Sequence, residues 1–255
     1  MLKSFIKKIP GAVSYYENKV VPKKRYNDFK KDFDAFTKLA SKEKRFSVLW
    51  KDIVPCLEDK TADTSFEPHY TYHPAWAARI LAKTNPKLHV DISSTLYFSA
   101  MISAFLPVEF YDYRPANLKL SGLSSGSMDL TSLPFPSNSV QSLSCMHVVE
   151  HIGLGRYGDP IDPDGDLKAI SELKRVVAKG GNLIFVTPIG KPKIVFNAHR
   201  IYSYKQIIKL FSKFTLTEYV LIPDNAFETG MIINATEEQT NNQNWGCGCF
   251  WFTKK

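Results

Sequence analysis

Three aspartates lie at or just after the ends of predicted strands, with a spacing that suits the binding of a small ligand. Asp112 follows Asp91 by 21 residues, close to the roughly 20 at which a second acid accepts hydrogen bonds from ribose hydroxyls. Asp129 follows a weaker strand candidate near Leu123, and the loops hold no glycine-rich cradle for phosphates. The pattern favours a ribose and a cationic group over a pyrophosphate, although a lone aspartate at a strand end is also a common turn residue.

Histidine, arginine and tyrosine residues follow the later strand candidates and suit a second ligand. His147 comes directly after the fourth candidate, and His199 with Arg200 follows the fifth. An imidazole takes a proton from a hydroxyl near neutral pH, so we select His147 first and His199 second as general bases. The guanidinium of Arg200 suits a phosphate or carboxylate, but a surface salt bridge explains it equally well. We expect the loop 153–166, which contains Tyr157, to form one wall of the pocket for this second ligand together with His199 and Arg200.

Alternating strand and helix patterns must position these side chains. From residue 88 onward, apolar strand-like runs alternate with helical periodicity, which is typical of a doubly wound sheet. The strand candidates are residues 88–92, 108–112, the region of Leu123, 140–146, 183–187, 215–222 and 249–253. The helix candidates are residues 73–83, 163–178 and 203–211, the second ended by Gly180-Gly181. Because the last two strand candidates have no predicted helix between them, we expect an antiparallel pair in a seven-stranded mixed α/β sheet with the first strand central.

An ordered set of motifs resembles a known enzyme family. The set comprises residues 129–136, Asn138-Ser139-Val140, residues 146–151, and residues 173–181 leading to Thr187-Pro188. It resembles the successive motifs of Rossmann-like S-adenosylmethionine-dependent methyltransferases. Residues 69–70, 89–92, 153–160 and 197–203 further resemble a bacterial branch that is often associated with surface-polysaccharide biosynthesis. The resemblance spans roughly residues 66–205.

The resemblance implies a cofactor, an acceptor class and roles for individual residues. Asp91 and Ser93 would lie beside the methionine part of S-adenosylmethionine, and Asp112 would hold its ribose. The adenine would be flanked by Met128 and Asp129. The implied acceptor is a hydroxyl or amine of a sugar, nucleotide sugar or lipid-linked glycan.

One departure from the family pattern keeps other functions open. The first loop of the family usually contains glycine, because the backbone approaches the ligand closely, whereas this chain has Ser93-Ser94-Thr95. A catalytically degenerate scaffold in glycan assembly is therefore the first alternative. A nucleic-acid methyltransferase is the second, supported only by a basic N-terminus. The chain lacks a base-flipping motif such as Asn-Pro-Pro-Tyr after the fourth strand, so we do not expect a nucleic-acid partner.

The composition favours a globular protein of a reducing compartment. The 255 residues are 44% hydrophobic and 23% charged, and the longest apolar runs are far shorter than the roughly 20 residues that a membrane span needs. Four cysteines are too few for a disulfide framework, and Cys247-x-Cys249 has no second pair to complete a zinc site. We therefore expect a cytoplasmic enzyme without a bound metal.

The basic charge is concentrated at the N-terminus. Residues 1–51 hold 14 Lys and Arg against 5 Asp and Glu, whereas the other 204 residues hold 19 against 20. We predict a helical N-terminal extension over residues 1–66 and a methyltransferase-like domain over residues 67–255. Within the extension, apolar residues recur at helical spacing with lysines between them over residues 2–9, and a second helix is predicted over 28–44. The first pattern suits peripheral contact with the inner membrane face, but the same apolar edge suits packing on the domain or on a second subunit slightly better.

Sedimentation with anionic liposomes tests the membrane hypothesis. If residues 1–25 lie in the membrane interface, the full-length protein should pellet at low salt, because each basic residue near an anionic surface contributes about 1 kcal/mol. A chain that starts near Tyr26 should stay in the supernatant. The same behaviour of both proteins, whether pelleted or soluble, would assign the helix to packing instead.

Overall fold

The computed structural model describes residues 21–42 and 45–255, and the chain divides into two compact units between Ser65 and Phe66. The described part of the first unit contains helix α3 (Val21–Leu39) and the 3-10 turns η2 (Ala40–Lys42) and η3 (Trp50–Asp52). The rings of Phe33 and Trp50 pack edge to face with centroids 4.9 Å apart. The helix begins earlier than the prediction of 28–44, and the predicted helix at 2–9 lies outside the described residues.

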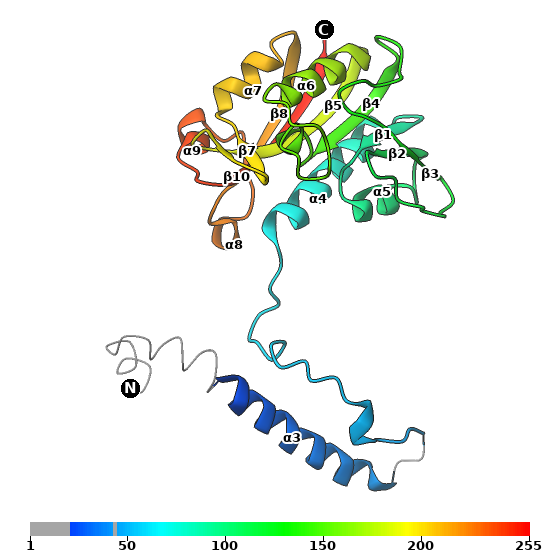
Figure 1. The fold of residues 1–255 in the computed structure, drawn as a ribbon, viewed down its shortest axis with the longest axis vertical. Coiled ribbons are helices and arrows are strands. Elements are labelled where there is room, and N and C mark those ends of the chain that lie inside the picture. The colour runs from blue at the N-terminus through cyan, green and yellow to red at the C-terminus, as the bar shows by residue number, and fades with distance from the viewer. Residues whose placement is uncertain (1–20, 43–44) are drawn as a thin grey trace. The chain divides into compact units, whose positions relative to one another are not determined.

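The second unit is built on one mixed sheet (Figure 1). Its strands are β1 (His89–Ile92), β2 (Val108–Asp112), β3 (Leu123–Ser127), β4 (Val140–Met146), β5 (Val177–Ile189), β8 (Phe214–Ile222), β9 (Ile232–Ile233) and β10 (Gly246–Lys254). Their order is β3-β2-β1-β4-β5-β10-β8-β9. Strands β1 to β5 are parallel to one another, whereas β10 is antiparallel to both β5 and β8. The predicted Rossmann-like α/β fold is confirmed, with the two-residue β9 added at one edge.

The strand order reverses at β1, and this reversal determines where a ligand can bind. Strand β2 pairs with one side of β1, where Asp91 is opposite Phe110, and β4 pairs with the other, where Asp91 is opposite Ser144. As predicted, Asp91 and Asp112 therefore end adjacent strands. The chain leaves β1 and β4 toward opposite sides, and such a switch point opens a crevice at the carboxyl ends of the strands.

Helices cover both faces of the sheet and bury two separate apolar clusters. The helices are α4 (Pro68–Thr84), α5 (Leu96–Ile102), α6 (Gly165–Val176) and α7 (Tyr204–Leu210). Leu173 of α6 and Phe185 of β5 belong to one cluster, whereas Trp76 of α4, Phe98 of α5 and Ile184 of β5 belong to the other. Successive residues of β5 thus point to opposite faces, as expected for a strand buried on both sides.

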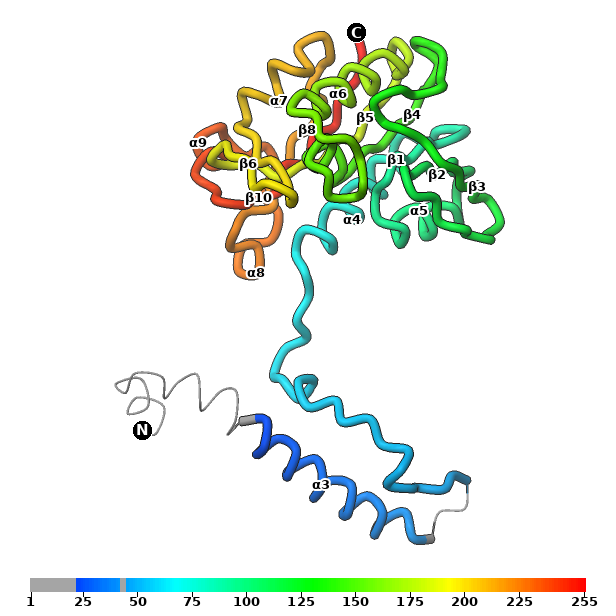
Figure 2. Tube along the Cα trace, viewed as in Figure 1, coloured from blue at the N-terminus to red at the C-terminus, as the bar shows by residue number. Residues whose placement is uncertain are grey.

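The segments after β5 and β8 differ most from the prediction. Figure 2 traces the chain from β5 through the hairpin β6 (Lys193–Val195) and β7 (His199–Ile201) to α7, and from β8 through α8 (Ala226–Thr229) and α9 (Glu237–Asn241) to β10. The expectation of no helix between the last two long strands was wrong, although the strands do pair antiparallel. These helices are only four and five residues long and lie in a polar stretch, so hydrophobic periodicity does not reveal them. The described residues include no helix that is both long and apolar enough to cross a membrane.

Candidate functional site

Three cavities meet at the carboxyl ends of β1, β2 and β4. The largest has a volume of about 640 Å³, and two smaller ones have volumes of about 110 and 100 Å³. Ser93 and Tyr157 line all three. The cavities therefore adjoin one another and form one cleft, with a large chamber and two narrow chambers that share Ser93 and Tyr157.

The carboxylate of Asp91 is buried under this cleft and lines none of the three cavities. It accepts hydrogen bonds from the hydroxyls of Ser144, at 2.5 Å, and Ser99. Ser144 lies within 2.9 Å of His89, whose pKa is lowered to about 3 by burial. Burial also raises the pKa of Asp91 to about 6, although hydrogen bonds from serines oppose the shift. Asp91 thus anchors the loop after β1 from within the protein.

The loop after β1 adopts the backbone conformation that glycine normally provides. Ser93 has φ 56°, in the left-handed region that most residues avoid. Its hydroxyl donates to the carbonyl of Tyr111 at 3.2 Å, and the hydroxyl of Ser94 accepts the backbone N–H of Met146 at 3.2 Å. Both serine side chains are engaged with neighbouring strands. The turn that the family builds with glycine is therefore present here with serine.

The two narrow chambers bring together the other predicted cofactor residues. Asp112 lines the chamber of about 100 Å³, and its carboxylate accepts the backbone N–H of Arg114 at 2.7 Å. Met128 and Asp129 line the chamber of about 110 Å³, where the carboxylate of Asp129 accepts from the backbone and hydroxyl of Thr131. Both acids retain further acceptor capacity, because a carboxylate offers about four lone-pair positions.

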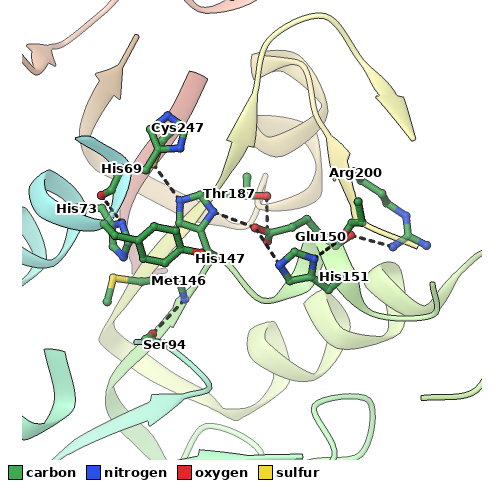
Figure 3. Close-up of polar contacts among 12 residues, drawn as sticks. His69, His73, Ser94, Met146, His147, Glu150, His151, Thr187, Arg200 and Cys247 are labelled. Atoms are coloured by element: carbon green, nitrogen blue, oxygen red, sulfur yellow. Dashed lines mark hydrogen bonds and ion pairs between the residues drawn. The ribbon is translucent and has the colours of Figure 1, made fainter. Parts of the chain in front are cut away.

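His147 lies at the back of the large chamber between a carboxylate and a thiol (Figure 3). Its Nδ1 is 2.9 Å from Oε1 of Glu150, and its Nε2 is 3.3 Å from Sγ of Cys247. Because a carboxylate only accepts, Nδ1–H is the donor, and Nε2 is the ring nitrogen that faces the thiol of Cys247. Burial raises the pKa of the Cys247 thiol well above its usual value. The nitrogen through which His147 would act as a general base therefore already has a partner.

His199 has a more open position in the large chamber. Its ring stacks on Trp245 with centroids 5.7 Å apart, and Trp245 is half exposed. Burial lowers the pKa of His199 below its usual value, so the imidazole is neutral at pH 7. Tyr157 lies between two guanidinium groups, with Arg114 4.4 Å and Arg156 5.1 Å from its ring centroid. Arg114 lines a narrow chamber and Arg156 the large one, so each of these two chambers has a guanidinium group as well as a carboxylate in its lining.

The structure does not bring Arg200 into the cleft. Its guanidinium is buried, donates to the carbonyl of Ile152 at 2.7 Å and to that of Pro163 at 3.2 Å, and lies 3.6 Å from Asp166. These contacts tie β7 to the loop that follows β4. Arg200 thus lines none of the three cavities, and Arg156 is the arginine that lines the large chamber.

A buried group of ring and thiol side chains beside His147 has no counterpart in the sequence-based selection of site residues. His69 stacks on His147 with ring centroids 5.8 Å apart, and His73 lies 5.0 Å from it edge to face. Cys247 comes from β10. These residues are far apart in the sequence, so no local spacing reveals them. The only signal was His69-Tyr70, as part of the family resemblance.

Comparisons with known proteins agree on the fold. A family model described as "Caenorhabditis protein of unknown function, DUF268" matches residues 136–244, and no curated protein matches the chain. The N-methyltransferase NodS from Bradyrhizobium japonicum, solved with S-adenosyl-L-homocysteine, is 12% identical, with a TM-score of 0.53 over 74% of this chain and 88% of that one. The 1,6-didemethyltoxoflavin-N1-methyltransferase from Burkholderia thailandensis, solved with its substrate and S-adenosylhomocysteine, is 9% identical, with a TM-score of 0.51 over 76% and 93%. The chain thus shares the fold of these methyltransferases.

The buried Asp91 should make stability depend on pH. Because its pKa rises from 3.8 unfolded to about 6 folded, the native state binds more protons than the unfolded chain between these values. Its contribution is therefore full below about pH 4 and is lost as the pH rises through 6, by about 3 kcal/mol. Asp91→Asn keeps the acceptor oxygen and cannot ionise, so the variant should lack this loss. Urea unfolding of both proteins from pH 4 to pH 7 measures the difference, and parallel curves would contradict it.

Proposed function

We propose that the protein transfers a methyl group from S-adenosylmethionine to a hydroxyl or amine of a sugar, nucleotide sugar or lipid-linked glycan. The observation that carries this proposal is the divided cleft, in which narrow chambers and a large chamber meet at Ser93. Ligands bound in the large chamber and in the narrow chambers would meet at Ser93. A transfer reaction between a cofactor and an acceptor needs this arrangement, since the reacting atoms must be held in line.

The residues of the narrow chambers fit the cofactor. Asp112 would accept from the ribose hydroxyls, and Met128 with Asp129 would flank the adenine. The left-handed backbone at Ser93 lets the methionine part approach the loop. When bound, S-adenosylmethionine supplies an electrophilic methyl group on a sulfonium. The chain itself has to orient the acceptor and keep water out.

The large chamber fits an anionic and partly apolar acceptor. Trp245 offers an exposed aromatic face, and Arg156 places a guanidinium in the same chamber. Aromatic surface with a few polar groups is typical of a small-molecule site, and a guanidinium binds phosphate well. A sugar that carries a phosphate or diphosphate combines both requirements. We therefore favour a nucleotide sugar or lipid-linked sugar over a neutral one.

His199 is the better general base of the two histidines selected from the sequence. Its imidazole is neutral at pH 7, and it lines the large chamber beside Trp245. The Nε2 of His147 faces Cys247 instead. His199 would take the proton of an acceptor hydroxyl as the new bond to carbon forms. The alternative of a degenerate scaffold rests on the replacement of glycine by serine in the first loop, and cofactor binding decides between the two.

Loss of the ribose acceptor should weaken cofactor binding. For Asp112→Ala we expect S-adenosylhomocysteine affinity to fall by about 2 kcal/mol, or roughly 30-fold, since two hydroxyls lose a charged acceptor. Isothermal titration calorimetry measures this. Asp164→Ala, an exposed acid that lines none of the cavities, is the matched control and should bind normally. If the wild-type protein gives no heat with millimolar ligand, the methyltransferase proposal is wrong and the degenerate scaffold becomes the preferred function.

Loss of the base should slow turnover without affecting the cofactor. With S-adenosylmethionine labelled on its methyl group and a panel of nucleotide sugars and lipid-linked sugars, His199→Gln should lower kcat at least 10-fold. S-adenosylhomocysteine affinity should be unchanged. Because burial lowers the pKa of His199, wild-type kcat/KM should fall only as the pH drops below 6.5. An equal loss of cofactor binding in the variant would assign His199 a structural role.

A further inference from the structure

Two imidazoles and a thiol converge at the back of the large chamber. His69 comes from α4, His147 from the turn after β4, and Cys247 from β10. One donor atom from each lies within 4.8 Å of the others. We propose that His69, His147 and Cys247 bind one Zn²⁺ ion. Figure 3 shows the three side chains close to one another.

The donor set has the chemistry that zinc prefers. Two histidine nitrogens and one cysteine sulfur are common Zn²⁺ ligands, and three protein ligands with an open fourth position are typical of a catalytic site. A nitrogen and a sulfur bound to one tetrahedral ion lie about 3.6 Å apart. Nε2 of His147 and Sγ of Cys247 are 3.3 Å apart, so this pair already has close to the required separation. The donor atom of His69 lies no more than 4.8 Å from the other two, so it would have to move about 1 Å closer to reach a tetrahedral separation.

Glu150 orients His147 as a metal ligand. The Nδ1–H of His147 donates to the fully buried Glu150, which leaves Nε2 as the ligand atom. Histidines that bind metals commonly donate their other N–H to a carboxylate in this way, and the contact fixes both the tautomer and the ring. The positive φ of 57° at His147 directs the side chain into this position. Such backbone strain is often found where a side chain must be held for function.

A second observation is a buried ring nitrogen of His73 that has no hydrogen-bond partner among the described residues. His73 lies edge to face with His147, and its Nδ1–H donates to the carbonyl of His69. Its Nε2 is buried and has no hydrogen-bond partner among the residues that the structure describes. Buried polar atoms of this kind usually have a partner. An ion with its water ligands brings such partners to this corner of the chamber.

The main alternative is a hydrogen bond from a neutral thiol to an imidazole. Sγ of Cys247 lies 3.3 Å from Nε2 of His147, and a thiol that keeps its proton would donate it to this nitrogen. A bound cation would displace that proton, and metal binding would release it to the buffer. The two explanations therefore differ in proton release and in the spectrum of the bound metal. Cys247-x-Cys249 lacks a second pair, and the expectation of no metal followed from that spacing alone.

The position of the ion would deepen the proposed function. His69 and His147 line the large chamber with His199, so the open position would face the acceptor. An acceptor hydroxyl at the ion would lose its proton more readily, and His199 would receive it. This role rests on the proposed function, whereas binding of the ion does not.

Cobalt and zinc titrations of the full-length protein test the site. The protein is stripped of metal, freed of any affinity tag and titrated with Co²⁺ under reducing conditions. We expect one equivalent to bind, with a thiolate-to-cobalt charge-transfer absorption, and Zn²⁺ to displace it. Cys247→Ser should abolish the absorption, and His69→Ala should weaken Zn²⁺ binding at least 100-fold. Cys56→Ser removes an exposed thiol and should behave as the wild type.

The wild-type protein alone makes the test decisive even if a variant fails to fold. Absence of the charge-transfer absorption, or of proton release on Zn²⁺ binding, would overturn the proposal, as would unchanged binding in a folded Cys247→Ser protein. Calorimetry with S-adenosylhomocysteine on the same metal-free protein separates the two proposals. Cofactor binding without cobalt binding would support the methyltransferase proposal and contradict the metal site. Cobalt binding without cofactor binding would support the metal site and contradict the methyltransferase proposal.

Discussion

The cleft depends on one buried carboxylate at the point where the strand order reverses. Asp91 accepts hydroxyl hydrogen bonds from Ser99 in α5 and from Ser144 in β4, and thereby joins the first strand to the next helix and to its neighbour. A carboxylate with no exposed surface is stable only when such donors satisfy it. The loop that follows carries Ser93 in its left-handed conformation and is joined to the neighbouring strands by the hydroxyls of Ser93 and Ser94. All three cavities meet at Ser93. The arrangement of the cavities therefore depends on the burial of Asp91, two residues earlier.

Periodicity predicted the sheet well, because burial on two faces leaves little choice of residue. Strands β2 and β4 have the predicted bounds. Strand β5 is longer than predicted: it begins at Val177, where a helix was expected to end, and passes through Gly180. Gly180-Gly181 was interpreted as a helix stop, but Gly180 takes its positive φ of 73° within the strand. Helix α4 begins at Pro68 because Glu67 caps its first turn, a local signal weaker than the apolar pattern from residue 73 onward.

The site could be predicted only where a strand end determines the position of a residue. Asp112 ends β2, Met128 and Asp129 directly follow β3, and all three line the narrow chambers. The orientation of Arg200 depends instead on the carbonyls of Ile152 and Pro163, which lie in a distant loop. His69 and Cys247 come together only through the packing of α4 and β10 against the end of β4. A single sequence contains no local signal for contacts of this kind.

The position of β10 between β5 and β8 has a consequence for biosynthesis. Residues 246–254 are translated after both of these strands, yet they form all the hydrogen bonds that join them. Until they leave the ribosome, β5 and β8 each present an unpaired edge, and such edges recruit other chains. We therefore expect nascent chains that stall before Gly246 to depend on chaperones. The cleft of this unit is therefore complete only after β10 has paired with β5 and β8, because β10 also carries Cys247.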